Sequence, residues 1–77
     1  MKVTLEFAKV LTVIRPELPE KVDLDLPEGA TLGDALAAAG VPQGLWGITL
    51  VGDRVCGTGE RLSDGDKVTV LPPVSGG

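Results

Sequence analysis

The sequence predicts a small α+β domain in which one helix packs across a mixed β-sheet. Apolar and polar residues alternate along several short segments, as they do in half-buried strands. One further segment has apolar residues at helical spacing between a start signal and a stop signal. Because 77 residues suffice for a single compact core, we expect one domain over residues 1–71 and a flexible C-terminal tail over residues 72–77.

Five segments have the composition of strands. The first two alternate clearly, and the last three are short, rich in β-branched residues and bounded by turn residues. The first two strands are joined by a long connection that contains proline, and we expect them to pair antiparallel. The five strands are expected at residues 2–8, 21–26, 48–51, 54–56 and 67–71.

The connection between the first two strands holds a stretch whose structure the pattern does not determine. Residues 9–14 are mainly apolar, and Arg15-Pro16 then interrupts them. This stretch either continues the first strand or forms a loop that covers one end of the core.

A helix of about nine residues is expected after the second strand. Thr31 suits the N-cap position, and Asp34 three residues later completes a near capping box. Gly40 is the expected stop signal. So short a helix is marginal unless it packs on a sheet. A right-handed crossover through it, with the final strand beside the first in mid-sheet, would give a ubiquitin-like β-grasp.

The composition argues against several classes of function. A formal net charge of −4 is unsuited to nucleic acid, which selects a basic surface. Histidine is absent and Cys56 is the single cysteine, so we expect no internal disulfide and no metal site. Cys56 is expected to be a packing residue, with a persulfide acceptor or a partner-linked thiol as the alternative. No apolar run of about 18 residues and no signal peptide is present, so we expect no membrane partner and a cytoplasmic location.

The last six residues are the candidate functional segment. Consecutive prolines favour an extended path, and the side chains then dwindle to two glycines, which let a partner's backbone approach closely. Such a tail can thread a narrow tunnel and present the carboxylate of Gly77 to chemistry in another protein. The residues expected to contact that partner are Pro72, Pro73, Val74 and Ser75 of the tail, with Trp46 from a loop of the domain.

Residues 62–77, Leu-Ser-Asp-Gly-Asp-Lys-Val-Thr-Val-Leu-Pro-Pro-Val-Ser-Gly-Gly, resemble the ubiquitin-like sulfur carriers of the MoaD/ThiS family. The shared pattern is a Leu-x-Asp-Gly-Asp turn, a hydrophobic strand and a Gly-Gly end. The Pro-Pro-Val segment and Phe7-Ala8 are closer to the small subunit of molybdopterin synthase. Residues 9–20 lack the charged, helix-like connection common in that branch, and Gly52-Asp53 stands where thiamine-branch members often have Asn-Gly.

The resemblance implies a role in sulfur transfer. An adenylating enzyme would use ATP to activate the Gly77 carboxylate, which becomes a thiocarboxylate, while Gly76 keeps the approach unobstructed. The chain would then be a co-substrate and not an enzyme, would bind no cofactor itself, and would pass sulfur to a synthase or its large subunit. Synthesis of a molybdopterin or tungstopterin cofactor is the favoured pathway and thiamine synthesis the next, and related domains also supply sulfur for tRNA thiolation.

Two other functions are open. A protein modifier would join Gly77 to a target lysine through an isopeptide bond, whereas a plain β-grasp interaction domain would not depend on the last residue. In the carrier reading, most affinity is expected from an apolar patch on the exposed sheet face, rimmed by carboxylates such as Asp23 and Asp25. Trp46 either belongs to this patch or covers the end of the core.

Overall fold

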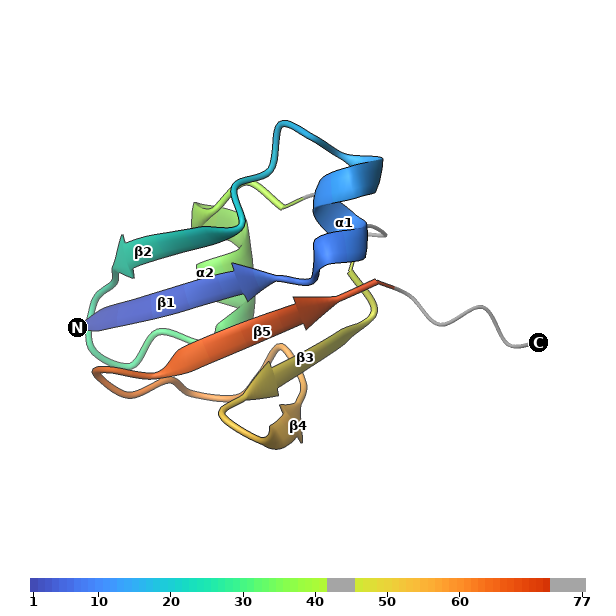
Figure 1. The fold of residues 1–77 in the computed structure, drawn as a ribbon. Helices are drawn as coiled ribbons and strands as arrows, with labels where there is room; N and C mark the ends of the chain where they lie inside the picture. The colour runs from blue at the N-terminus through green and yellow to red at the C-terminus, as the bar shows by residue number, and fades with distance from the viewer. Residues whose placement is uncertain (42–45, 73–77) are drawn as a thin grey trace.

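The computed structural model of the chain describes residues 1–41 and 46–72. Strands and helices follow one another through these residues, and the N-terminal strand lies in the interior of the sheet (Figure 1). In chain order the elements are β1 (Lys2–Phe7), α1 (Lys9–Ile14), β2 (Lys21–Asp25), α2 (Leu32–Ala38), β3 (Ile48–Val51), β4 (Arg54–Cys56) and β5 (Lys67–Leu71).

The five strands form one mixed sheet in the order β2-β1-β5-β3-β4. The central pair, β1 and β5, is parallel, and the other three pairs are antiparallel. Helix α2 lies across one face of this sheet and leaves the other face open (Figure 1). The α+β architecture, the antiparallel first pair and the final strand in mid-sheet beside the first are therefore confirmed.

Alternation along β1 and β5 builds the centre of the core. Leu5 and Val68 face each other across the parallel pair, and both are fully buried. Burying a leucine or valine side chain contributes about 1.5–3 kcal/mol. The polar residues that alternate with the buried ones along β1 and β5 point to the open face. The sequence pattern thus decides which face of the sheet α2 covers.

Helix α2 begins with the expected capping box. The Thr31 hydroxyl accepts a hydrogen bond from the backbone N–H of Asp34 at 3.2 Å, and the Asp34 carboxylate accepts one from the N–H of Thr31 at 2.9 Å. The helix stops before Gly40, whose φ of 74° is one that glycine adopts without strain. Leu32 and Leu36 are buried against the sheet, as the helical spacing predicts.

Removing the cap is expected to weaken the domain measurably. Thr31→Ala leaves the Asp34 N–H without its side-chain acceptor, which should lower the free energy of unfolding by about 1 kcal/mol. Thr31→Ser keeps the hydroxyl and is the matched control, and it should change the free energy of unfolding by only a few tenths of a kcal/mol. Urea denaturation measures both. Equal losses in the two variants would mean that the hydroxyl does not act as the cap.

Residues 9–14 neither continue the first strand nor form a loop, so both alternatives expected from the sequence are wrong. They form helix α1. The carbonyl of Ala8 accepts hydrogen bonds from the N–H groups of Leu11 and Thr12, at 2.9 and 3.4 Å. Leu11 is 1% exposed and anchors the helix to the core. The connection therefore is helical after all, although its helix is apolar. Burial of Leu11 overrides the strand preference of the β-branched residues around it.

The turn before β5 is held by its two aspartates. The Asp64 carboxylate accepts a hydrogen bond from the N–H of Lys2, and the Asp66 carboxylate accepts one from the N–H of Ser63, each at 2.7 Å. The first bond ties the turn before β5 to the start of β1, and the second closes the turn itself. Within residues 1–41 and 46–72, no helix has the length and apolar character needed to cross a membrane.

Candidate functional site

The candidate site begins where β5 ends, at Leu71, because the tail follows directly. The Leu71 carbonyl accepts a hydrogen bond from the N–H of Gly47 at 2.9 Å, and Pro72 beyond it is half-buried. The tail is therefore attached to a strand that is paired on both sides. The predicted contact residues Pro73, Val74 and Ser75 and the predicted reactive residues Gly76 and Gly77 lie outside the described residues.

Four aliphatic side chains lie on the open face of the sheet beside this attachment point. Across β3 and β5, Ile48 is paired with Leu71, and across β3 and β4, Leu50 is paired with Val55. Their strand neighbours, such as Thr49, are buried toward α2, so alternation places these four on the opposite face. We call Ile48, Leu50, Val55 and Leu71 the sheet patch.

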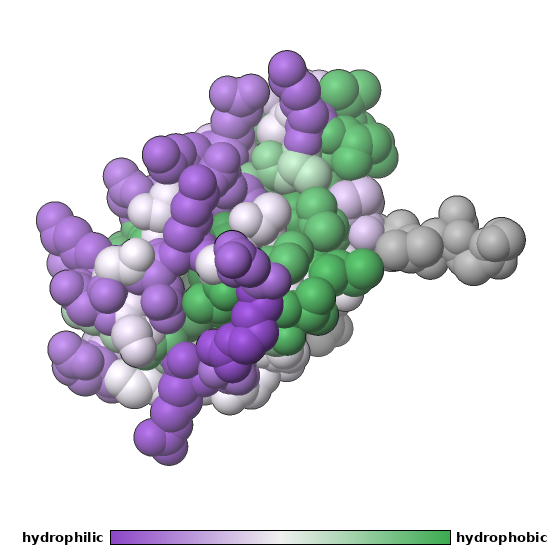
Figure 2. Space-filling view, turned by 60° about the horizontal axis from the view of Figure 1, so that its bottom comes forward, coloured by the Kyte–Doolittle hydropathy of each residue, from purple (hydrophilic) through white to green (hydrophobic). Residues whose placement is uncertain are grey.

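The sheet patch is exposed to a useful degree. Val55 is 68% exposed, and the other three side chains are half-buried. Figure 2 shows apolar side chains gathered in the middle of this face, with polar ones beside them. The structure therefore contains the expected apolar area on the open sheet face. This area lies next to the point where the tail begins, at Pro72, which we call the tail root.

Polar side chains on β1 and β2 occupy the remainder of the open face. Lys67 on β5 forms an ion pair with Glu6 on β1 at 2.7 Å, and the hydrogen bond from Lys67 holds the pKa of the Glu6 carboxyl below its usual value. The Thr4 hydroxyl donates to the Asp23 carboxylate at 2.9 Å. Asp23 and Asp25 are exposed on β2, which β1 separates from β5. The Glu6–Lys67 pair thus lies closer to the sheet patch than the two aspartates do.

Trp46 lies on the helix side of the domain, outside the sheet patch. Its half-buried side chain packs against the core and lines a hollow of about 270 Å³. Between the two alternatives, the structure thus shows Trp46 covering the end of the core, while its contact with a partner stays a prediction. The other residues around the hollow are Gly33, Leu36, Ala37, Val41 and Thr58.

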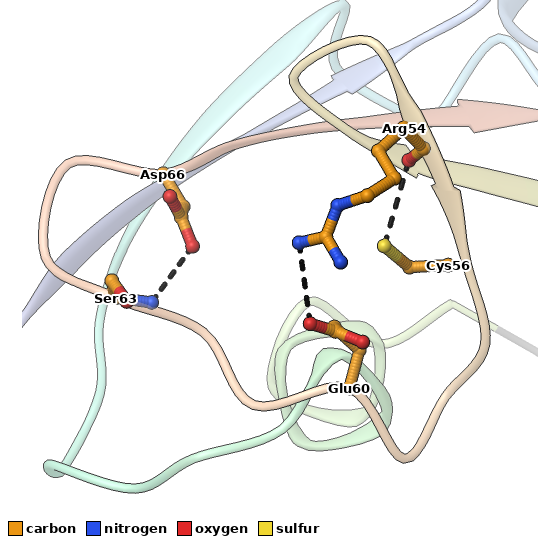
Figure 3. Close-up of polar contacts among 5 residues, drawn as sticks. All are labelled: Arg54, Cys56, Glu60, Ser63 and Asp66. Carbon is orange, nitrogen blue, oxygen red and sulfur yellow. Dashed lines mark hydrogen bonds and ion pairs between the residues drawn. The ribbon is translucent and has the colours of Figure 1, made fainter.

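The polar side chains near β4 make contacts within β4 and with the loop that follows it. Arg54 and Glu60 form an ion pair at 3.3 Å, and the Cys56 thiol lies 3.5 Å from the carbonyl of Arg54 (Figure 3). Figure 3 also shows the Asp66 carboxylate turned toward the N–H of Ser63. Cys56 is 8% exposed, which is consistent with a packing residue. Within the part of the chain that the structure describes, no three metal-ligating side chains gather.

Sequence reasoning missed one apolar surface, on the helix that starts beside the end of β5. Val10, Val13 and Ile14 of α1 are 47%, 75% and 59% exposed. The apolar composition of residues 9–14 was the signal, but only a helix places these three on one side. They lie at positions i, i+3 and i+4, which are neighbours on a helix surface.

Solved structures with the same fold come from archaea and bacteria. Small archaeal modifier protein 1 from Haloferax volcanii matches with a TM-score of 0.76 and 23% identity, covering 95% of this chain and 98% of that one. A Pyrococcus furiosus protein described as molybdopterin converting factor, subunit 1, matches with a TM-score of 0.76 and 24% identity, covering 96% and 99%. Comparison with curated proteins gives no match.

A complex offers a third likeness. It contains subunits 1 and 2 of the molybdopterin-converting factor from Helicobacter pylori, and the matching chain has a TM-score of 0.65 and 24% identity over the full length of both chains. These likenesses confirm the ubiquitin-like β-grasp fold. The model of the ThiS family matches residues 8–77, which include both helices, the four strands β2 to β5 and the tail, but not β1. The chain therefore belongs to the ThiS family, as the Asp-Gly-Asp turn and the Gly-Gly end predict.

Proposed function

We propose that the chain is a sulfur carrier whose Gly77 carboxylate is adenylated and then converted to a thiocarboxylate. The observation that carries this proposal is the ThiS family match, which extends through the Gly-Gly end. The attachment of the tail to a central strand supports it, because a firmly held β5 gives a partner a fixed point from which to receive the tail.

The chemistry explains why a carrier needs so little of its own. A carboxylate is a poor electrophile, so a partner enzyme must join it to the AMP portion of ATP and release pyrophosphate. Hydrosulfide (HS⁻) supplied by the partner then attacks the acyl carbon and displaces AMP, which leaves the thiocarboxylate on Gly77 with no change in oxidation state. This chain supplies the carboxylate and the docking surface, and it acts in the cytoplasm, where ATP is available. The partner supplies ATP binding and the catalytic groups.

Two partners follow from this scheme. The first is the adenylating enzyme, and the second is a synthase subunit that accepts the sulfur. The second receives support from the Helicobacter pylori neighbour, which is a complex of subunits 1 and 2. We therefore favour a molybdopterin-type or tungstopterin-type pathway, with thiamine synthesis as the next candidate.

Exchange of label between pyrophosphate and ATP tests the proposal directly. With the adenylating enzyme of the source organism, the intact chain should support exchange that depends on its concentration, because the acyl-adenylate forms reversibly. The same enzyme without the chain is the control. No exchange above that control would contradict the proposal.

A protein modifier is the second candidate function. The likeness to small archaeal modifier protein 1 favours it specifically. Both functions begin with adenylation of the terminal carboxylate and differ in what displaces AMP. Hydrosulfide leaves a thiocarboxylate, whereas the thiol of a conjugating enzyme forms a thioester from which the chain passes to a lysine. The exchange assay therefore does not separate them, and the mass of the modified terminus does.

Most of the affinity for the adenylating enzyme is expected to come from the folded domain. The tail offers two glycines and a serine, whereas the sheet patch offers a contiguous apolar surface beside the tail root. A peptide of residues 71–77 should therefore bind about a hundredfold more weakly than the intact chain, equivalent to about 2.7 kcal/mol.

Isothermal titration calorimetry measures this division. A chain truncated after Pro72 is the complementary variant, and it should keep most of the affinity because the sheet patch and the fold are intact. If the peptide binds as tightly as the whole chain, recognition resides in the tail and the sheet patch plays no part.

A further inference from the structure

Helix α1 exposes apolar side chains that do not stabilise the helix or the core of the domain. Of its six residues, only Leu11 is buried, and no side chain caps its first turn. Neither an acidic residue in the first turn nor a basic one in the last turn favours the helix electrostatically. Val10, Val13 and Ile14, which we call the α1 patch, form one apolar side of this helix. Single exposed apolar residues are ordinary, but three side by side on one short helix form a patch that suits a partner.

The α1 patch lies near the root of the tail. The N–H of Ala8 donates a hydrogen bond to the carbonyl of Val70 at 2.9 Å, so α1 starts beside the end of β5. Figure 1 shows α1 at the end of the sheet where β5 finishes. Figure 2 shows the apolar side chains of this helix and those of the sheet patch on the same visible face. The two patches thus lie on two sides of the point where the tail begins.

The length of the tail limits how far a partner can stay from this end of the domain. Five residues follow Pro72, and a fully extended chain spans at most about 3.6 Å per residue, or about 18 Å in total. An acyl-adenylate is hydrolysed by water, so an enzyme that forms one must enclose the reacting terminus. Most of the 18 Å reach is then spent inside the enzyme, and the tail-bearing end of the domain must lie against its surface.

We propose that α1 is a docking element for the adenylating enzyme, with Val13 and Ile14 packed on an apolar area at the rim of the channel that receives the tail. This inference rests on the proposed function and adds a contact that the sheet patch does not supply. Contacts on two sides of the tail root fix the direction in which the tail leaves the domain. A single patch would leave the domain free to pivot about it.

The double variant Val13→Ser/Ile14→Ser tests this role through the exchange assay. Because these contacts are remote from the reacting carboxylate, they should stabilise the bound ground state and the transition state equally. The KM for the carrier should therefore rise about tenfold while kcat stays within about twofold. The matched control is Val13→Ile/Ile14→Val, which keeps both positions apolar and should leave KM unchanged.

Further measurements keep the outcomes distinct. Thermal unfolding shows whether the double serine variant is folded, and the single variant Val13→Ser, at a side chain 75% exposed, serves if it is not, with an expected rise in KM of about threefold. A folded variant with the same KM as the wild type contradicts the role of α1 but leaves the carrier function intact. Absence of exchange with the wild-type chain overturns the carrier function itself. A loss of binding confined to the synthase subunit would also contradict the inference, because it would assign α1 to the other partner.

Discussion

Appending one residue after Gly77 is expected to abolish pyrophosphate exchange completely. The extension removes the reactive group, since the carboxylate then belongs to a different residue at a different distance from the domain. The fold should not change, because β5 ends at Leu71 and is held by β1 and β3. Circular dichroism and thermal unfolding should therefore match those of the wild type. Deletion of Gly77 should have the same effect on exchange.

A removable extension provides the control for this prediction. If the added residues can be cut off by a protease that cleaves directly after Gly77, exchange should return to the wild-type level with the same preparation. Recovery would show that the loss came from the position of the carboxylate and not from damage to the domain. Normal exchange by the extended chain before cleavage would rule out adenylation at Gly77.

Leu36→Ala is expected to produce the largest loss of stability among the substitutions considered. Leu36 is 3% exposed and anchors α2 to the sheet, so its truncation should lower the free energy of unfolding by about 2–5 kcal/mol. A domain of this size has a total stability of about 4–11 kcal/mol. The variant should therefore be partly unfolded at or near 37 °C. A typical domain is most stable at about 10–20 °C and loses stability above that temperature.

Urea denaturation at constant slope measures this loss, and Ala38→Ser is the matched control on the exposed side of α2. The control changes only helix propensity and should cost less than about 1 kcal/mol. A loss for Leu36→Ala as small as that of the control would show that α2 is held by other residues, chiefly Leu32 and Ala35.

Local sequence signals were sufficient where they agreed with tertiary packing. The alternation in β1 and β5, the capping box at Thr31 and the glycine stop at Gly40 each depend on neighbouring residues, and each is present in the structure. Helix α1 was missed because its determinant is not local. Val13 and Ile14 favour a strand by themselves, and only the burial of Leu11 in the assembled core makes the helix favourable.

The candidate site divides in the same way. The tail could be identified from its residue types, because prolines and glycines have consequences that do not depend on a fold. The sheet patch followed from alternation once the covered face was known. The position of Trp46 could not be predicted, because a loop residue has no periodicity to assign it to a face, and the structure places it beside α2.

The mass of the C-terminal peptide isolated from cells tests the central claim most directly. After gentle lysis and proteolysis, the peptide ending at Gly77 should carry a mass increase equal to the replacement of one oxygen by one sulfur. This increase should disappear in cells that lack the adenylating enzyme. An unmodified terminus, together with lysines of other proteins that carry residues 68–77 as the branch left by trypsin cleavage after Lys67, would contradict sulfur carriage and establish the chain as a protein modifier.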